Sequence, residues 1–247
     1  MRCEVSWAHV NLTPVSDPIP VVLIPGLIAS PRLYAAQIPH LWKYGPVTIA
    51  DHTRDDSMSA IAQRILATAP ERFALAGLSM GGYICFEILR LAPERVAKLA
   101  LLDTSAQPDT PEQTAARREQ VALAWGGRFP EVVDTLFPRM VHKQHRDSAA
   151  LREVFGLMAQ EVGPAGFVRQ QNAIMGRVDS RPTLASISCP TLVLVGDGDE
   201  VTPPDRAAEI AGGIAGAKLV TVQQCGHLST LERPVEVTRA LVEWLWA

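Results

Sequence analysis

Short apolar runs alternate along the chain with longer stretches in which apolar residues recur at helical spacing. Runs of four to six mostly apolar residues predict strands that are buried on both faces, which is typical of a parallel sheet covered by helices. Six such runs are expected to be strands: 20–24, 47–50, 73–76, 98–103, 191–196 and 218–222. The pattern therefore predicts an α/β fold, with a mostly parallel sheet flanked by helices.

The alternation stops between about Gln107 and Ser188, where helical periodicity recurs without a convincing strand. The helical stretches are 110–125, 129–137, 147–162 and 165–176. This pattern predicts a helical lid at 107–183, inserted into an α/β core formed by 1–106 and 184–247. Large apolar side chains of the lid either line a pocket above the strand ends or pack the lid helices together, and packing is expected for most of them: Trp125, Phe129, Phe137, Phe155, Met158, Phe167 and Met175.

Length and charge narrow the functional classes. At 247 residues with 47% hydrophobic content, the chain can bury one substantial core. Its formal net charge is -3, with both signs interspersed, so a basic nucleic-acid surface and an electrostatically held membrane protein are not indicated. The low net charge favours a small or weakly charged molecule as the substrate. The sequence does not indicate the oligomeric state.

The N-terminus and the cysteines point to a soluble, cytoplasmic protein. Residues 1–14 lack a basic stretch followed by an apolar core, and no segment approaches eighteen uninterrupted apolar residues. Cys3, Cys85, Cys189 and Cys225 are scattered without a C-x-x-C pair, so neither a zinc site nor a disulfide framework is expected. Reduced, partly buried thiols follow, with Cys225 expected to be a small buried hydrophobe.

The segment 73–82, FALAGLSMGG, carries the main chemical signal. It places Ser79 between Gly77 and Gly81, where an apolar run long enough for a buried strand passes into a helical pattern. A Gly-x-Ser-x-Gly pattern at a strand-to-helix turn needs glycines because the flanking backbones pass too close for a Cβ, and it presents the serine hydroxyl outward. Ser79 is therefore the candidate nucleophile.

A serine hydroxyl needs a nearby base, and the base needs an acceptor that fixes its tautomer. Acidic residues follow the predicted strand 191–196 in the sequence DGDE, and His227 follows the predicted strand 218–222. The order along the chain is serine, acid, histidine.

With these features, the chain resembles the α/β-hydrolase family over nearly its whole length. The matching segments are LIPGL, GLSMG, LVGDGDEVTPP and CGHLSTLERP, and the predicted lid falls where family members carry a cap domain. The resemblance implies that Ser79 is the nucleophile, Asp199 the acid and His227 the general base. It implies no metal or organic cofactor.

The acid and the base each have alternatives. Family members usually place the acid at the last position of Gly-x-x-Asp, which favours Asp199 over its neighbour Asp197, whereas Asp103 occupies the place used by a minority of related lipases. For the base, His52 follows a predicted strand, where ligands bind in such sheets, but a partly exposed loop histidine is the favoured interpretation.

The tetrahedral intermediate of acyl transfer needs donors aimed at its oxyanion, and two backbone amides commonly supply them. One is expected from Met80. The other is expected from Leu27, because Pro25-Gly26-Leu27 matches the family's His-Gly-x loop. Pro25 stands where the family has a histidine, so the motif does not say what holds this loop.

The resemblance makes hydrolysis of small carboxylic esters, through an acyl-enzyme, the leading functional hypothesis. Thioester, lactone and carbon–carbon cleavage use the same triad, and some relatives perform perhydrolysis. Dehalogenases and epoxide hydrolases are disfavoured, because they place aspartate where Ser79 stands. A ligand receptor or pseudoenzyme that keeps the pocket without useful turnover is the alternative from a different class.

Overall fold

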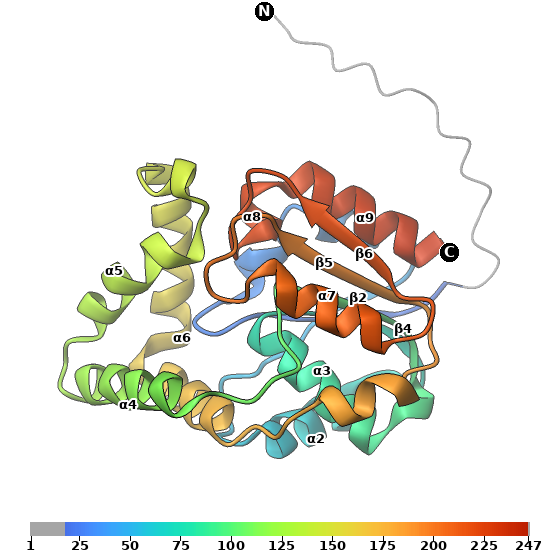
Figure 1. Ribbon diagram of the computed structural model, residues 1–247, viewed down its shortest axis with the longest axis horizontal. Helices are drawn as coiled ribbons and strands as arrows, with labels where there is room; N and C mark the ends of the chain where they lie inside the picture. The colour runs from blue at the N-terminus through green and yellow to red at the C-terminus, as the bar shows by residue number, and fades with distance from the viewer. Residues whose placement is uncertain (1–17, 247) are drawn as a thin grey trace, which may run out of the picture.

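The computed structural model describes residues 18–246, and their centre is a sheet of six parallel strands in the order β2-β1-β3-β4-β5-β6 (Figure 1). The strands are β1 (Val21–Ile24), β2 (Val47–Ile49), β3 (Phe73–Leu78), β4 (Val96–Leu102), β5 (Thr191–Gly196) and β6 (Lys218–Val222). Each overlaps one of the six apolar runs, so the predicted α/β class with a parallel sheet is confirmed.

Helices cover both faces of this sheet. The helices outside the insertion are α1 (Ile38–Leu41), α2 (Met58–Thr68), α3 (Met80–Leu91), α7 (Pro204–Gly213), α8 (Ser229–Glu232) and α9 (Pro234–Trp246). Along β3, Ala74 and Ala76 pack into the hydrophobic cluster that contains α1 and α9. Phe73 and Leu75 pack into the cluster that contains α2, α3 and α7. β1, β3 and β5 are buried at every residue and are almost entirely apolar, whereas the edge strand β6 is mostly exposed and carries Lys218 and Thr221.

The segment between β4 and β5 is helical, as its periodicity predicts. It forms α4 (Pro111–Trp125), α5 (Phe129–Met140) and α6 (Ala149–Met175), which stand beside the carboxyl ends of the strands in Figure 1. Two predicted stretches are joined in α6, which is broken at Gly163, where φ is 67°, just before Pro164. Glycine adopts this φ freely, and proline disfavours a helical residue before it, so the break has a local cause. The division into core and lid at residues 107 and 183 stays a prediction.

The large apolar side chains of the lid pack against one another, as expected for most of them. The rings of Phe129 and Phe167 lie 5.3 Å apart and those of Phe137 and Phe155 lie 5.7 Å apart, between centroids. Met158 is fully buried beside them, whereas Trp125 is 67% exposed. These contacts tie α5 to α6, and the same side chains belong to the hydrophobic cluster that includes Ala74 and Ala76 of β3.

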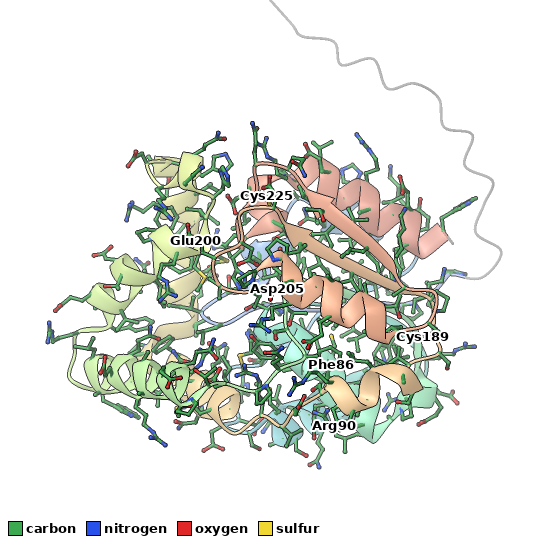
Figure 2. The ribbon with its side chains drawn as sticks, in the orientation of Figure 1. Phe86, Arg90, Cys189, Glu200, Asp205 and Cys225 are labelled. Carbon is green, nitrogen blue, oxygen red and sulfur yellow. The ribbon has the colours of Figure 1, made fainter. Side chains whose placement is uncertain are left out.

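The cysteines of the described chain are unpaired. Cys85 and Cys225 are buried, as expected for Cys225, and Cys189 is partly buried. Figure 2 shows Cys189 and Cys225 at opposite ends of the sheet, beyond the reach of a disulfide. Cys3 and the expectations for residues 1–14 lie outside the described residues. Within residues 18–246, no helix is both long and apolar enough to cross a bilayer.

Candidate active site

Ser79 stands alone between the end of β3 and the start of α3, in a strained backbone conformation with φ 56° and ψ -116°. Such a conformation costs about 1–3 kcal/mol and persists only where the surroundings enforce it. A Cβ on Gly77 would lie 2.4 Å from the backbone of Gly81, and one on Gly81 would lie 2.1 Å from the carbonyl oxygen of Ile24. Only glycines permit this turn, which is the physical reason for the sequence pattern.

The fold brings Ser79, His227 and Asp199 into one hydrogen-bonded chain. Nε2 of His227 lies 2.8 Å from Oγ of Ser79, and Nδ1 of His227 lies 2.8 Å from Oδ2 of Asp199. All three residues are buried, at 8%, 2% and 3% exposure. With Asp199 ionised, Nδ1 donates to the carboxylate and Nε2 accepts the Ser79 hydroxyl proton, which is the protonation state that a general base requires.

Asp199 is fixed by donors that the sequence analysis did not single out. Its Oδ1 accepts the backbone N–H groups of Val201 and Thr202 at 2.8 and 2.9 Å, and its Oδ2 accepts the hydroxyl of Thr202 at 2.8 Å. An aspartate that caps the amides two and three residues later is a familiar turn, so this signal was present in the sequence. These bonds leave Oδ2 aimed at His227.

The protonation states follow from the same contacts. Burial acts to raise the pKa of Asp199, but the charge and hydrogen bond of His227, with the Thr202 donors, hold that pKa below its ordinary value. Burial also disfavours the charged form of His227, yet the Asp199 carboxylate, with smaller contributions from Asp103 and Glu232, raises the pKa of His227 above its ordinary value. The pair therefore favours an imidazolium during catalysis.

The alternative acids, Asp103 and Asp197, make hydrogen bonds to other groups than His227. Asp103 is fully buried, accepts the N–H of Gly196 at 3.0 Å and is hydrogen-bonded to Ser229. Burial, followed by the charge of Asp199, raises the pKa of Asp103 well above its ordinary value. Asp197 accepts the N–H of Cys225 at 3.0 Å. Among the three candidates, the hydrogen bond to His227 is made by Asp199.

The two predicted oxyanion donors flank the nucleophile. Met80 is the first residue of α3, and Leu27 lines the same cavity as Ser79. Within residues 18–246, neither amide has a hydrogen-bond acceptor, whereas the next amide along the loop, that of Ile28, donates to Oε1 of Gln170 at 2.9 Å. The Leu27 and Met80 amides are therefore available to a ligand at Ser79.

His52 and Gln170 hold the loop that carries Leu27. With its proton on Nε2, His52 donates to the carbonyl oxygen of Gly26 at 2.8 Å; Nε2 of Gln170 lies 2.9 Å from the same nitrogen, which can accept from this amide only in the other tautomer. The favoured interpretation of His52 as partly exposed is wrong, because it is 2% exposed, and burial lowers its pKa and keeps it neutral. Ile28 adopts a φ of 61°, which is costly for a β-branched residue, so these contacts hold a strained loop in place.

A second set of contacts joins the lid to the loop that carries His227. Glu232, whose side chain is fully buried, accepts the backbone N–H of His142 at 2.8 Å and that of Gly226 at 2.9 Å, and it pairs with Nδ1 of His145 at 2.8 Å. The N–H of Leu228 also donates to the carbonyl of Met140, at 3.0 Å. Glu232 belongs to the CGHLSTLERP segment, but its role depends on lid residues that the motif does not contain.

A cavity of about 340 Å³ opens beside the nucleophile. Ser79 and Leu27 line it from the core, Leu136 and Met140 from α5, and Ile174 from α6. A larger hollow of about 580 Å³ contains His52 but not Ser79, so its size does not make it the reaction site. None of the seven large lid residues singled out from the sequence lines the cavity at Ser79.

Among residues 18–246, no three His, Cys, Asp or Glu side chains are grouped as metal ligands.

Comparisons with known proteins agree with this architecture. The family model described as "Alpha/beta hydrolase family" matches residues 21–240. A 2-hydroxy-6-oxononadienedioate/2-hydroxy-6-oxononatrienedioate hydrolase from Paraburkholderia xenovorans is 26% identical, covering 83% of this chain and 73% of the relative. A pimeloyl-[acyl-carrier protein] methyl ester esterase from Chromobacterium violaceum is 25% identical, covering 75% of both chains.

Among solved structures, a thermophilic esterase from Thermogutta terrifontis superimposes with a TM-score of 0.83. It is 29% identical, and the match covers 92% of this chain and 89% of the esterase. The fold, including the helices beside the strand ends, is thus shared over nearly the whole length of both proteins.

The two buried carboxyls give a matched pair of variants. We expect Asp199→Asn to reduce kcat/KM for ester hydrolysis by about 10⁴-fold, because the amide favours the wrong His227 tautomer. Asp103→Asn should keep most of the activity, since the hydrogen bonds of Asp103 go to Gly196 and Ser229, whereas Asp199 is the carboxylate bonded to His227. Steady-state kinetics on both variants checks this, and the opposite ranking would make Asp103 the acid.

The anchor of the oxyanion loop predicts a specific kinetic defect. Gln170→Leu removes the acceptor of the Ile28 amide, so kcat should fall by about tenfold with little change in KM, because oxyanion contacts strengthen in the transition state. Asn172→Leu, at an exposed position on the same helix, is the control and should leave kcat unchanged. A folded Gln170→Leu protein with wild-type kcat would show that the loop does not need this anchor.

Proposed function

The chain belongs to the alpha/beta hydrolase family of enzymes, and on this premise we propose that it is a serine hydrolase that cleaves small carboxylic esters through an acyl-enzyme intermediate. The observation that carries the proposal is the chain of two 2.8 Å hydrogen bonds from Ser79 through His227 to Asp199 at the wall of a cavity. A nucleophile, its base and an orienting acid in this arrangement support acyl transfer.

In the acylation step, Nε2 of His227 takes the proton of the Ser79 hydroxyl as Oγ bonds to the carbonyl carbon of the ester. The carbonyl oxygen gains the electron pair, and the N–H groups of Leu27 and Met80 donate to the oxyanion. When the intermediate collapses, the leaving oxygen takes the proton from His227 and departs as an alcohol. The acyl group remains on Ser79.

In the deacylation step, water takes the place of the alcohol. His227 accepts a proton from the water as its oxygen bonds to the acyl carbon, and the same amides hold the second oxyanion. Collapse returns the proton from His227 to Ser79 and releases the carboxylic acid. Each oxyanion donor is expected to contribute about 3 kcal/mol to the barrier reduction, which is why the bonds that hold the Leu27 loop matter.

The dimensions of the cavity support a small substrate. Its volume of about 340 Å³ falls at the lower end of the range of small-molecule sites. Leu136, Met140, Ile174 and Val201 supply apolar surface for a short acyl or alcohol group. The proposal involves a small ester-like molecule and neither a nucleic acid nor a membrane.

Thioesterase, enol-lactonase and carbon–carbon hydrolase activities remain alternatives that the same groups can perform. Each begins with attack on a carbonyl carbon and needs the same oxyanion donors. The relative from Paraburkholderia xenovorans, named for the hydrolysis of an oxo-dienedioate, supports keeping the carbon–carbon alternative. Esters are preferred because the relatives from Thermogutta terrifontis and Chromobacterium violaceum are both named esterases.

Substitution of Ser79 tests its role as the nucleophile. We expect wild-type protein to release p-nitrophenol from short-chain acyl esters, and Ser79→Ala to lose this activity almost completely because no other group can form the acyl-enzyme. Ser105→Ala is the control, since Ser105 lines the same cavity but takes no part in the triad. Equal turnover by wild type and Ser79→Ala over a graded acyl series would overturn the proposal.

The raised pKa of His227 predicts how the rate of ester hydrolysis depends on pH. His227 accepts a proton only when it is neutral, and its pKa lies above the ordinary value of about 6.5. The kcat/KM for a neutral ester should therefore fall on the acid side, with a midpoint above about pH 6.5. Rates measured from about pH 5 to 9 locate this midpoint, and a value well below that of free imidazole would contradict the assigned His227–Asp199 pair.

A further inference from the structure

The cavity beside Ser79 is positively charged although the chain as a whole is negative. Six charged side chains line it: Asp109, Glu112, Arg117, Arg139, Arg177 and Arg206. Four guanidinium groups against two carboxylates leave the lining with a charge of +2, whereas the whole chain has a formal charge of -3. A small cavity with such an excess attracts an anionic ligand.

Part of this excess positive charge belongs to side chains that are fixed in the wall of the cavity. Asp109, whose side chain is 2% exposed, pairs with two arginines at once: Nε of Arg117 lies 2.7 Å from Oδ2, and Nη1 of Arg177 lies 2.7 Å from Oδ1. One carboxylate between two guanidinium groups leaves this cluster with a charge of +1. A single arginine would balance the charge of Asp109, so the second guanidinium leaves a positive charge in the cavity wall.

Arg177 is held rigidly, with one nitrogen, Nη2, free of acceptors within residues 18–246. Its guanidinium lies over the ring of Tyr83, 4.3 Å from the centroid, and its Nη1 also donates to the carbonyl of Ile174 at 3.1 Å. Its Nε donates to the carbonyl of Gln107 at 3.2 Å. Its Nη2 has no acceptor within the described chain, although the side chain is only 8% exposed and lines the cavity. A fixed, nearly buried donor therefore faces the cavity.

Arg139 supplies a second positive charge, which is exposed and has no side-chain partner in the part of the chain that the structure describes. It stands in the last turn of α5, lines the cavity, and makes no ion pair or hydrogen bond with any residue from 18 to 246. Arg206 pairs only loosely, at 3.7 Å, with its exposed neighbour Asp205. Glu112 is exposed in the first turn of α4, and it offsets one of these two charges.

We propose that the substrate carries a carboxylate remote from the scissile carbonyl, which Arg177 binds through Nη2 and Arg139 approaches from α5. The proposal rests on the proposed function, because it describes the substrate of the same cavity. A carboxylate fits because one negative charge balances the +1 of the Asp109 cluster, and because arginine donors match its planar oxygens. The overall charge, which favoured a weakly charged substrate, does not report this local excess.

The test compares esters that differ only in that charge. The substrates are the p-nitrophenyl monoesters of adipic, pimelic and suberic acids, each against the p-nitrophenyl ester of the corresponding ω-amide, which is neutral and nearly isosteric. For the best chain length, kcat/KM should be at least about tenfold higher for the acid, the value expected for a charge-assisted hydrogen bond in a partly dehydrated site. Equal values at all three lengths would overturn the proposal.

Two variants locate the effect. Arg139→Gln removes a side chain without partners in the described chain, so it should fold normally and lower the acid-to-amide ratio. Arg177→Gln should lower the ratio further, towards 1. Arg128→Gln is the matched control: it removes the same charge at the start of α5, outside the cavity, where Arg128 pairs with Glu131, and it should leave the ratio at its wild-type value. An unchanged ratio in Arg139→Gln and Arg177→Gln would overturn the assignment.

A binding measurement separates this proposal from the proposed function. Isothermal titration of Ser79→Ala protein with the same acid and amide esters reports affinity without turnover. Tighter binding of the acid supports the carboxylate site even if wild-type protein hydrolyses neither ester, in which case the esterase proposal alone fails. Equal affinity for both overturns the carboxylate site, and Ser79-dependent turnover of the neutral ester would then leave the esterase proposal intact.

Discussion

The 2.8 Å hydrogen bond between His227 and Ser79 joins two loops that lie 148 residues apart in the chain, and the rest of the site depends on it. The bond forms because β3, β5 and β6 are parallel, so the loops after them meet at one edge of the sheet. Ser79 reaches that edge in a strained conformation, and His227 is oriented by a carboxylate that the Thr202 donors hold in place. The sheet order is therefore the scaffold for the chemistry.

The lid makes hydrogen bonds to two loops of the candidate site. From α6, Gln170 bonds the loop that carries the expected oxyanion donor, and from the end of α5 the backbone meets the loop of His227 through Glu232 and Leu228. Glu200, after β5, pairs with Arg146 of the lid, and Figure 2 shows Glu200 on the side that faces α5. A shift of the lid would reach the oxyanion loop and the histidine loop together.

Local patterns predicted the six strands, the helical insertion and the positions of Ser79 and His227, because those features are encoded by nearby residues. Gln170 escaped the sequence analysis, since its partner Ile28 lies 142 residues away and a glutamine on a helix carries no motif. His52 was expected to be partly exposed because it follows a strand, but the lid helix α6 covers it. The pairing of Asp109 with two arginines could not be predicted either, because no sequence motif marks it.

Covalent labelling with a fluorophosphonate, followed by intact-mass and peptide-mass measurement, tests whether Ser79 is an activated nucleophile. An activated serine forms a stable phosphonate ester with this reagent, whereas an ordinary serine hydroxyl does not react at neutral pH. We expect one added phosphonyl group per chain, located on Ser79, and slow or absent labelling of His227→Ala. A mass unchanged by the reagent, or a phosphonyl group on any residue other than Ser79, would contradict the assignment of Ser79 as the nucleophile.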